Sequence, residues 1–207
     1  REILKVRELE RQRIAKELHD SVGSQLTVVS TSLDNAFFLA ENHRLVPEKI
    51  ENISSEVRLA AQSLRDTIWA THNTTISVTQ LYARIQHYLS KISENSPSLV
   101  VNSERIGTDV VLNSIQALNI FRIFQEAIQN IQKHAEASEV GIDISSDNQV
   151  FKMKIIDNGK GFSADKVIIN ENFGLSNMKN RSDEIAAFLT IQSEENAGTT
   201  IVLELPL

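Results

Sequence analysis

A histidine and an aspartate stand side by side in a segment whose pattern predicts a helix. The stretch RIAKELHDSVGSQL, residues 13–26, contains His19 and Asp20. Apolar residues recur there every four positions, at Ile14, Leu18, Val22 and Leu26. His19 follows directly after Leu18, about 100° further round the helix. Two interpretations stay open: a half-buried packing residue, or a nucleophile at the edge of a core.

Polar side chains share one face of a second predicted helix, residues 114–137. These residues follow helical spacing and are Glu126, Asn130, Lys133 and His134. A solvated helix face is the ordinary interpretation of such residues. Asn130 is a poor helix former away from a cap position, which favours a ligand role. Its carboxamide oxygen and the carboxylate one turn before it could bind Mg²⁺, whose other ligands would be water and phosphate.

Glycines mark loop positions in the second half of the chain. The stretch IDNGKGF, residues 156–162, places Asp157 at the end of a predicted strand. Such a sequence is also an ordinary turn, but a repeated glycine allows the backbone to approach a ligand closely. The amides at the start of a helix suit a phosphate. The loop glycines of this half are Gly159, Gly161, Gly174 and Gly198.

The first half of the chain has helical periodicity. One predicted helix ends near residue 42, Pro47 follows in a short linker, and apolar residues from Ile50 to Ile68 recur every three or four positions. Two such helices form an antiparallel hairpin. Two hairpins can bury their apolar stripes in a dimeric four-helix bundle. A plain coiled-coil spacer is the alternative.

After about residue 74 the period changes. Helices are predicted at residues 78–94, 114–137 and 174–187, with strands at residues 98–102, 140–145, 150–157, 188–193 and 200–206. The alternating apolar residues indicate an antiparallel or mixed sheet that helices cover on one face. The predicted fold class is α+β, with a helical hairpin at residues 1–73 and a two-layer α/β sandwich at residues 74–207.

Composition narrows the classes of function. The chain has 207 residues and a net charge of −6, which argues against nucleic-acid binding, because that depends on lysine and arginine neutralising phosphates. It lacks cysteine, so disulfides and thiolate metal sites are excluded. No apolar run approaches the roughly 20 residues that a bilayer requires, and no signal peptide opens the chain. Because Arg1 stands first, we expect a fragment of a longer protein. Without a membrane-spanning run or a signal peptide, the fragment is expected to be soluble and cytoplasmic, with a sensor segment, attached to a membrane, upstream.

Four of these stretches resemble the nucleotide-binding boxes of the ATPase fold shared by Hsp90, gyrase, MutL and histidine kinases. They are QEAIQNIQKHA, DNGKGF, GLSNMKNR and AGTT. ERQRIAKELHDSVGSQL resembles the phosphoacceptor box of sensor histidine kinases with a DesK-like or nitrate-sensor-like bundle, and LRDTIWA resembles the end of that bundle's second helix. The resemblance covers nearly the whole chain. It implies a homodimeric kinase core that binds ATP and Mg²⁺ and passes a phosphoryl group from a histidine to an aspartate of a response regulator.

For the phosphoacceptor box, the resemblance implies that His19 takes the γ-phosphoryl group on Nε2 and that Asp20 is the base. A neighbouring carboxylate can accept the proton of the other ring nitrogen and fix the tautomer. Relatives often carry glutamine or histidine five residues after the phosphohistidine, to position water for dephosphorylation; here that residue is Ser24. Gln25 points further round the helix, so we expect weak phosphatase activity.

For the nucleotide site, the resemblance implies that Asp157 accepts a hydrogen bond from the adenine amino group. Asn130 would bind Mg²⁺, with Glu126 assisting the metal or orienting a water. The other implied nucleotide-binding residues are Lys133 and His134 near the phosphates, Gly159, Gly161 and Gly174 around a lid at residues 162–173, Leu175, and Thr199 beside the adenine. A glycine common two places before Gly174 is Asn172 here, so we expect an altered lid, since asparagine tolerates left-handed backbone.

Two other functions stay open at this point. A catalytically inactive scaffold could keep the same fold and bind only nucleotide or partners. An ATP-driven clamp of the gyrase or MutL type is disfavoured by the phosphoacceptor segment and by the acidic net charge. Acid-labile, base-stable phosphate on His19 would separate a kinase from both alternatives.

Overall fold

The computed structural model describes most of the chain after residue 74 and scattered positions before it. The described residues are 27, 29–31, 33–34, 36, 38, 50, 53–54, 57–58, 61, 64–66, 68–69, 75–96, 98–163 and 173–207. The chain divides into two units, residues 1–73 and 74–207, and each is described by itself. The predicted phosphoacceptor pair, Ser24 and most of the predicted lid lie outside the described residues.

The first unit is helical at every described position, from residue 27 to 38 and again from residue 50 to 69. The helical prediction is therefore confirmed for those positions. Large apolar side chains are exposed there in the single chain: Leu33, Phe38, Ile50, Val57, Leu64 and Ile68. Exposed large apolar side chains that recur along a helical segment are typical of a surface that a partner covers.

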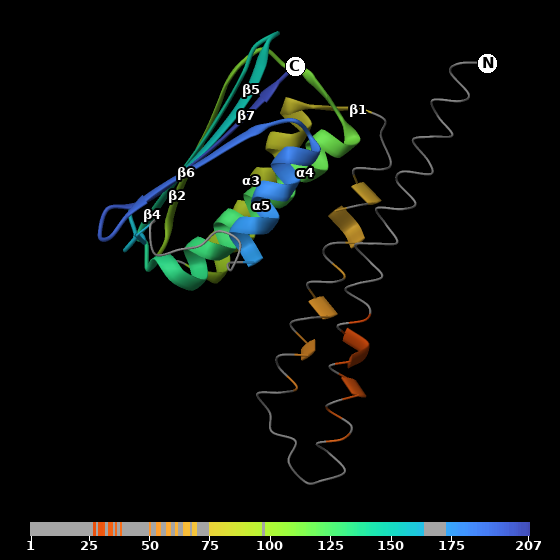
Figure 1. The fold of residues 1–207 in the computed structure, drawn as a ribbon, viewed down its shortest axis with the longest axis vertical. Coiled ribbons are helices and arrows are strands. Elements are labelled where there is room, and N and C mark those ends of the chain that lie inside the picture. The colour runs from red at the N-terminus through yellow and green to blue at the C-terminus, as the bar shows by residue number, and fades with distance from the viewer. Residues whose placement is uncertain are drawn as a thin grey trace, which may run out of the picture. The chain divides into compact units, whose positions relative to one another are not determined.

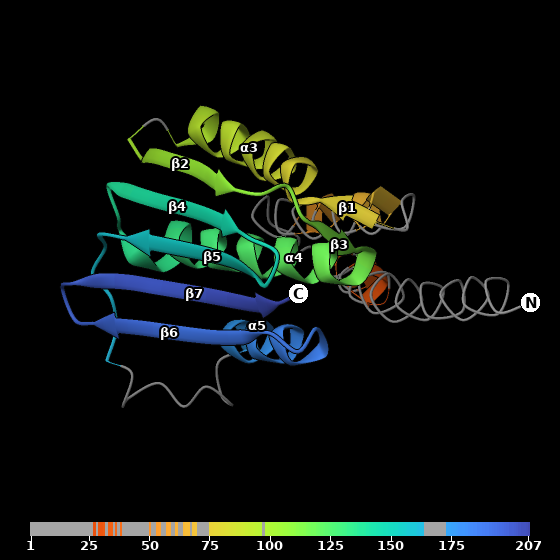
Figure 2. The same cartoon turned by 90° about the horizontal axis from the view of Figure 1, so that it is seen from above.

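The second unit is a two-layer α/β sandwich, as predicted. Its five-stranded sheet has the order β2-β4-β5-β7-β6, and three helices lie on one face of that sheet (Figure 1). β2 pairs with β4 in parallel and the other neighbours are antiparallel, so the sheet is mixed; Figure 2 shows its strands side by side. The elements are α3 Val78–Asn95, β2 Val100–Gly107, α4 Ser114–Asn130, β4 Glu139–Ser146, β5 Val150–Asp157, α5 Phe173–Glu184, β6 Phe188–Glu194 and β7 Gly198–Pro206.

Alternating apolar residues on the central strands fill the space between sheet and helices. β4 and β5 bury every second residue, and so does the second half of β7. From α4, Ile120, Phe124 and Ala127 are buried in this core. Phe124 stacks on Phe121, and the ring of Tyr88 from α3 meets both rings edge-on. The apolar face predicted for the long helix is confirmed.

The long helix is shorter than predicted. α4 ends at Asn130, and a π-helical turn, η1, Ile131–Ala135, follows it. Glu136 then takes a left-handed conformation with a φ of 54°, which ends the helical segment before the predicted residue 137. The sequence hides the change, because Ile131 and Ala135 are buried apolar residues that continue the spacing of the helix.

Other element bounds also differ from the prediction. The strand predicted at residues 98–102 covers residues 100–107 in the structure. The prediction was too short because this strand lies at the edge of the sheet, where exposed polar residues mask the apolar pattern. α5 ends at Glu184 and not at residue 187, and Ala186 beyond it has a φ of 55°. A two-stranded sheet of β1, Thr75–Ser77, and β3, Val111–Asn113, is absent from the prediction, because such short strands show no period.

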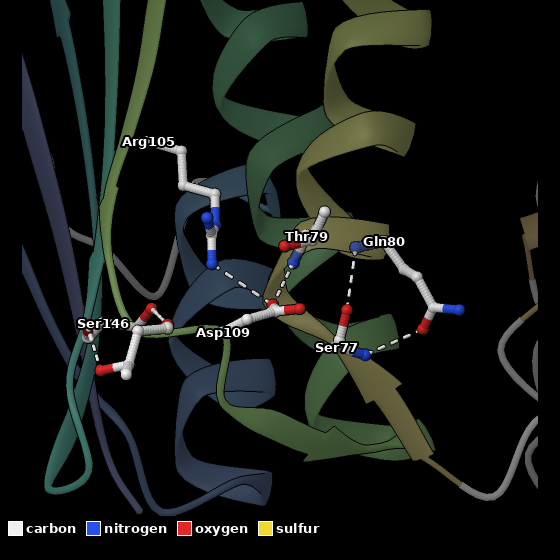
Figure 3. Close-up of polar contacts among 7 residues, drawn as sticks. Ser77, Thr79, Gln80, Arg105, Asp109 and Ser146 are labelled. Carbon is white, nitrogen blue, oxygen red and sulfur yellow. Dashed lines mark hydrogen bonds and ion pairs between the residues drawn. The ribbon is translucent and has the colours of Figure 1, made fainter.

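Side chains cap the N-terminus of α3 (Figure 3). Ser77 Oγ accepts a hydrogen bond from the Gln80 N–H at 3.3 Å, and Gln80 Oε1 accepts one from the Ser77 N–H at 2.9 Å. Asp109 Oδ1 accepts a hydrogen bond from the Thr79 N–H at 2.8 Å and lies 3.3 Å from the Arg105 guanidinium. The Thr79 amide, with a smaller contribution from Arg105, holds the pKa of Asp109 below its usual value. N–H groups that the helix itself cannot satisfy are thereby paired.

Removing the charge of Asp109 should lower the free energy of unfolding of the domain only at pH values at which that carboxylate is ionised. We expect Asp109→Asn to lower the free energy of unfolding at neutral pH by up to about 1 kcal/mol, because the group is exposed. A lowered folded-state pKa stabilises above the usual value of 3.8, and this contribution is lost as the pH falls through the folded-state value. The difference from wild type in urea unfolding should therefore shrink below pH 3.8. Glu104→Gln, at an exposed position of β2, is the control; a loss that does not change with pH would contradict this account.

Candidate functional site

One cavity of about 260 Å³ is lined by α4, η1, α5, the end of β5, the middle of β6, the first half of β7, and the loop after β5. Most of its lining is apolar, as is typical of a small-molecule site with few polar anchors. The lining residues are Ala127, Asn130, Ile131, His134, Ala135, Asp157, Lys160, Gly161, Phe162, Leu175, Ile191, Thr199 and Ile201.

Asp157 is the buried carboxylate of this cavity. It is the last residue of β5, lies opposite Thr199 of β7, and is only 5% exposed. The Gly159 N–H donates a hydrogen bond to its Oδ1 at 2.8 Å. Burial raises the pKa of Asp157, while hydrogen bonds from Gly159 and Thr199 partly oppose the rise. Such a carboxylate can accept a hydrogen bond from a ligand amino group, and it disfavours a ligand that brings a second acceptor to the same place.

The turn after Asp157 is fastened to the segment that follows η1. Asn158 Oδ1 accepts hydrogen bonds from the N–H groups of Ser138 and Glu139, each at 3.0 Å. The Asn158 amide group also donates to Ser138 Oγ at 2.9 Å. These bonds hold the end of β5 beside the end of η1, so both elements contribute to one cavity.

Two glycines allow this turn to pack against neighbouring backbone. A Cβ at Gly159 would lie 2.3 Å from the carbonyl oxygen of Ala135, and one at Gly161 would lie 2.0 Å from that of Glu194. Gly161 also has a φ of 56°, which residues with a side chain rarely adopt. The sequence analysis expected these glycines to approach a ligand. The close approach in the structure is to η1 and to the end of β6, so packing alone already requires glycine at both positions.

The polar face predicted on the long helix lies only partly at the cavity. Asn130 and His134 line it, and the Asn130 side chain forms no capping hydrogen bond at the start of η1. Lys133 is exposed, Glu126 is half-buried, and neither is among the lining residues. For Lys133 the π-helical turn explains the difference, because its bonds join residues five apart and the α-helical spacing used for the prediction no longer holds after Asn130. Glu126 lies within α4, before that turn.

Ser193 does not line the cavity but supports two residues that do, and no sequence pattern predicted it. Its hydroxyl accepts a hydrogen bond from the Phe162 N–H at 2.9 Å and lies 3.0 Å from the Thr199 hydroxyl. Thr199 in turn donates hydrogen bonds to Asp157, so hydrogen bonds connect the buried carboxylate with the loop after β5. Only the pairing of Ser193 with Thr199 across β6 and β7 identifies this residue, because no motif marks it.

The other predicted residues differ in where they lie. Leu175, near the start of α5, is buried and lines the cavity, whereas its neighbour Gly174 is half-buried and is not among the lining residues. His19 and Asp20 belong to the other unit and lie outside the described residues. Phe162, the first residue of the predicted lid, lines the cavity, as do Lys160, Ile191 and Ile201, for which no site role was predicted.

Two other kinds of feature are absent from the described residues. In that part of the chain, no helix combines the length and the apolar character needed to cross a bilayer. The same residues contain no group of three or more histidine, cysteine, aspartate and glutamate side chains placed to hold a metal ion.

Two family models match the chain. Residues 10–75 match the family described as histidine kinase, and residues 115–207 match the histidine kinase-, DNA gyrase B- and HSP90-like ATPase family. The chain is 28% identical to the sensor histidine kinase LiaS of Bacillus subtilis over 199 residues, covering 96% of the chain and 54% of that protein. It is 31% identical to the sensor protein VraS of Staphylococcus saprophyticus over 205 residues, covering 99% of the chain and 58% of that protein. The chain thus spans little more than half the length of these relatives.

Solved structures support the fold. The histidine kinase domain of the blue-light activated kinase of Erythrobacter litoralis matches with a TM-score of 0.57 at 18% identity, covering 98% of this chain and 94% of that one. The histidine kinase AdeS of Acinetobacter baumannii matches with a TM-score of 0.61 at 12% identity, covering 91% and 97%. With both family models in the order that the motifs predict, the chain belongs to the histidine kinases and contains a histidine kinase segment, residues 10–75, followed by an ATPase domain of the gyrase and HSP90 type, residues 115–207.

Proposed function

We propose that this chain uses ATP to phosphorylate His19 and passes the phosphoryl group to an aspartate of a response regulator. The observation that carries the proposal is the buried carboxylate of Asp157 in a cavity of an ATPase-type domain. The same chain carries the pair His19 and Asp20 within its histidine kinase segment. One chain therefore contains both the proposed nucleotide site and the proposed phosphoryl acceptor.

In the nucleotide site, Asp157 accepts a hydrogen bond from the amino group of adenine, and Thr199 holds that carboxylate in place. Asn130 and His134 contact the phosphates in this proposal, which their shared place in the cavity lining supports. Lys133, exposed on η1, is the third proposed phosphate contact. Asn130 is suited to bind Mg²⁺, because this residue lines the cavity and its side chain forms no capping hydrogen bond at the start of η1. Glu126, one turn earlier, is the second proposed ligand. A bound Mg²⁺ would neutralise phosphate charge.

At the acceptor, Nε2 of His19 attacks the γ-phosphorus, so that a nitrogen–phosphorus bond forms and the bond to the bridging oxygen of ADP breaks. Attack requires an unprotonated Nε2. Asp20 takes or shares the proton of the other ring nitrogen and so fixes the tautomer. In the second transfer, a carboxylate oxygen of the regulator attacks the same phosphorus and the imidazole leaves.

The exposed apolar side chains of the first unit support homodimerisation through residues 1–73. Two alternatives are less well supported. An inactive scaffold would not need the neighbouring His19 and Asp20. A clamp of the gyrase type is disfavoured by the histidine kinase segment at residues 10–75.

Asp157→Asn should weaken ATP binding without weakening the fold. A hydrogen bond to a charged group contributes about 1.5–3 kcal/mol, so calorimetry should give a loss of affinity of about tenfold or more. Burial raises the pKa of Asp157, so a neutral amide relieves a desolvation cost and the melting temperature without nucleotide should not fall. Asp143→Asn, a half-buried position of β4, is the matched control. An unchanged affinity for ATP would refute the adenine role of Asp157.

His19→Gln should abolish phosphorylation and leave nucleotide binding intact, since every residue that lines the cavity belongs to the second unit. The measurement is acid-labile, base-stable label from radioactive ATP, together with ATP affinity by calorimetry. His87→Gln, an exposed position of α3, is the control and should keep the label. Label that persists in His19→Gln would place the acceptor elsewhere.

A further inference from the structure

The cavity is lined by a lysine to which the proposed chemistry gives no role. Lys160 lines the cavity, and its Nζ forms an ion pair of 2.7 Å with Oε1 of Glu136. Among the described lining residues, Lys160 is the only lysine or arginine and Asp157 the only carboxylate. A polyphosphate that enters this cavity brings several negative charges, and the ammonium group of Lys160 is already paired with Glu136.

The backbone of Lys160 is fixed on both sides. Its N–H donates to the carbonyl oxygen of Ala135 at 2.8 Å, and its own carbonyl oxygen accepts a hydrogen bond from the Asn196 N–H at 2.6 Å. Glu136 follows directly after η1, in the left-handed conformation. Any exchange of partners therefore takes place through the Lys160 side chain, while the turn that carries it stays in place.

The ion pair is easily exchanged. The side chains of Lys160 and Glu136 are 53% and 79% exposed, and exposed ion pairs contribute little to stability. Phosphate oxygens carry more charge than one carboxylate and bind an ammonium strongly. The cost of separating Lys160 from Glu136 is therefore small compared with the gain when the ammonium contacts a phosphate.

We propose that Lys160 binds the polyphosphate of the nucleotide and that Glu136 competes with the nucleotide for its ammonium group. Lys160 is then a residue that selects phosphate-bearing nucleotides, and Glu136 lowers their affinity. The inference rests on the proposed function, since it takes the nucleotide to occupy the cavity. Because adenosine has no phosphate, its binding affinity should not depend on either side chain.

The test compares the affinities of the full chain for ATP and for adenosine by calorimetry. Lys160→Gln should weaken ATP binding about tenfold, as expected for loss of a charge-assisted hydrogen bond, and leave adenosine binding unchanged. Glu136→Gln should tighten ATP binding by up to about fivefold, the limit set by an exposed ion pair. In the Lys160→Gln background, Glu136→Gln should have no further effect, because Glu136 acts only through the ammonium.

A second ion pair of the same domain provides matched controls. Lys152 and Glu204 pair at 2.7 Å on β5 and β7, and neither lines the cavity. Lys152→Gln and Glu204→Gln remove the same charges and should leave both affinities unchanged. Equal ATP affinity in Lys160→Gln and wild type would overturn the inference, as would a Glu136→Gln effect that persists without Lys160. A wild-type chain that binds neither ATP nor adenosine would instead overturn the proposed function itself.

Discussion

The structure of the site depends on the burial of one carboxylate. Asp157 ends β5 almost without exposure, and burying a charge is costly unless hydrogen bonds compensate for lost water. The Gly159 amide and Thr199 supply part of this compensation, yet the pKa of Asp157 remains raised. The remaining cost is one that a ligand's amino group can offset by donating a hydrogen bond to the carboxylate. A site whose buried carboxylate can accept one more hydrogen bond is suited to bind a ligand that donates one.

The fold provides this arrangement through the register of its sheet. The pairing of β5 with β7 places Thr199 opposite Asp157, and the pairing of β6 with β7 adds Ser193 beside Thr199. Asn158 fastens the turn after β5 to the residues after η1. The helical side of the cavity, with Asn130 and His134, is thereby held against the sheet side.

Much of this could be predicted from the sequence, where a local pattern carries the information. The strand pattern that stops at Asp157 and the polar residue within a helix at Asn130 marked both as candidates, and the resemblance to known ATPases implied their roles. Ser193 could not be predicted, since its role depends on which residue of β7 lies opposite it.

The change from α4 to η1 was also invisible in the sequence, because the buried Ile131 and Ala135 keep the apolar spacing of a continuous helix. This is why Lys133 was grouped with Asn130 and His134, although it lies outside the lining. The pair of Lys160 and Glu136 joins residues from two segments that only the folded chain brings together.

The recognition of the adenine amino group by Asp157 can be tested by changing the ligand, without altering the protein. Inosine triphosphate carries a carbonyl oxygen where ATP carries the amino group, and it keeps the same phosphates. If Asp157 accepts a hydrogen bond from that amino group, wild-type affinity measured by calorimetry should fall by about tenfold or more for inosine triphosphate, since a buried acceptor would then face a second acceptor. Equal affinities for the two nucleotides would contradict the account.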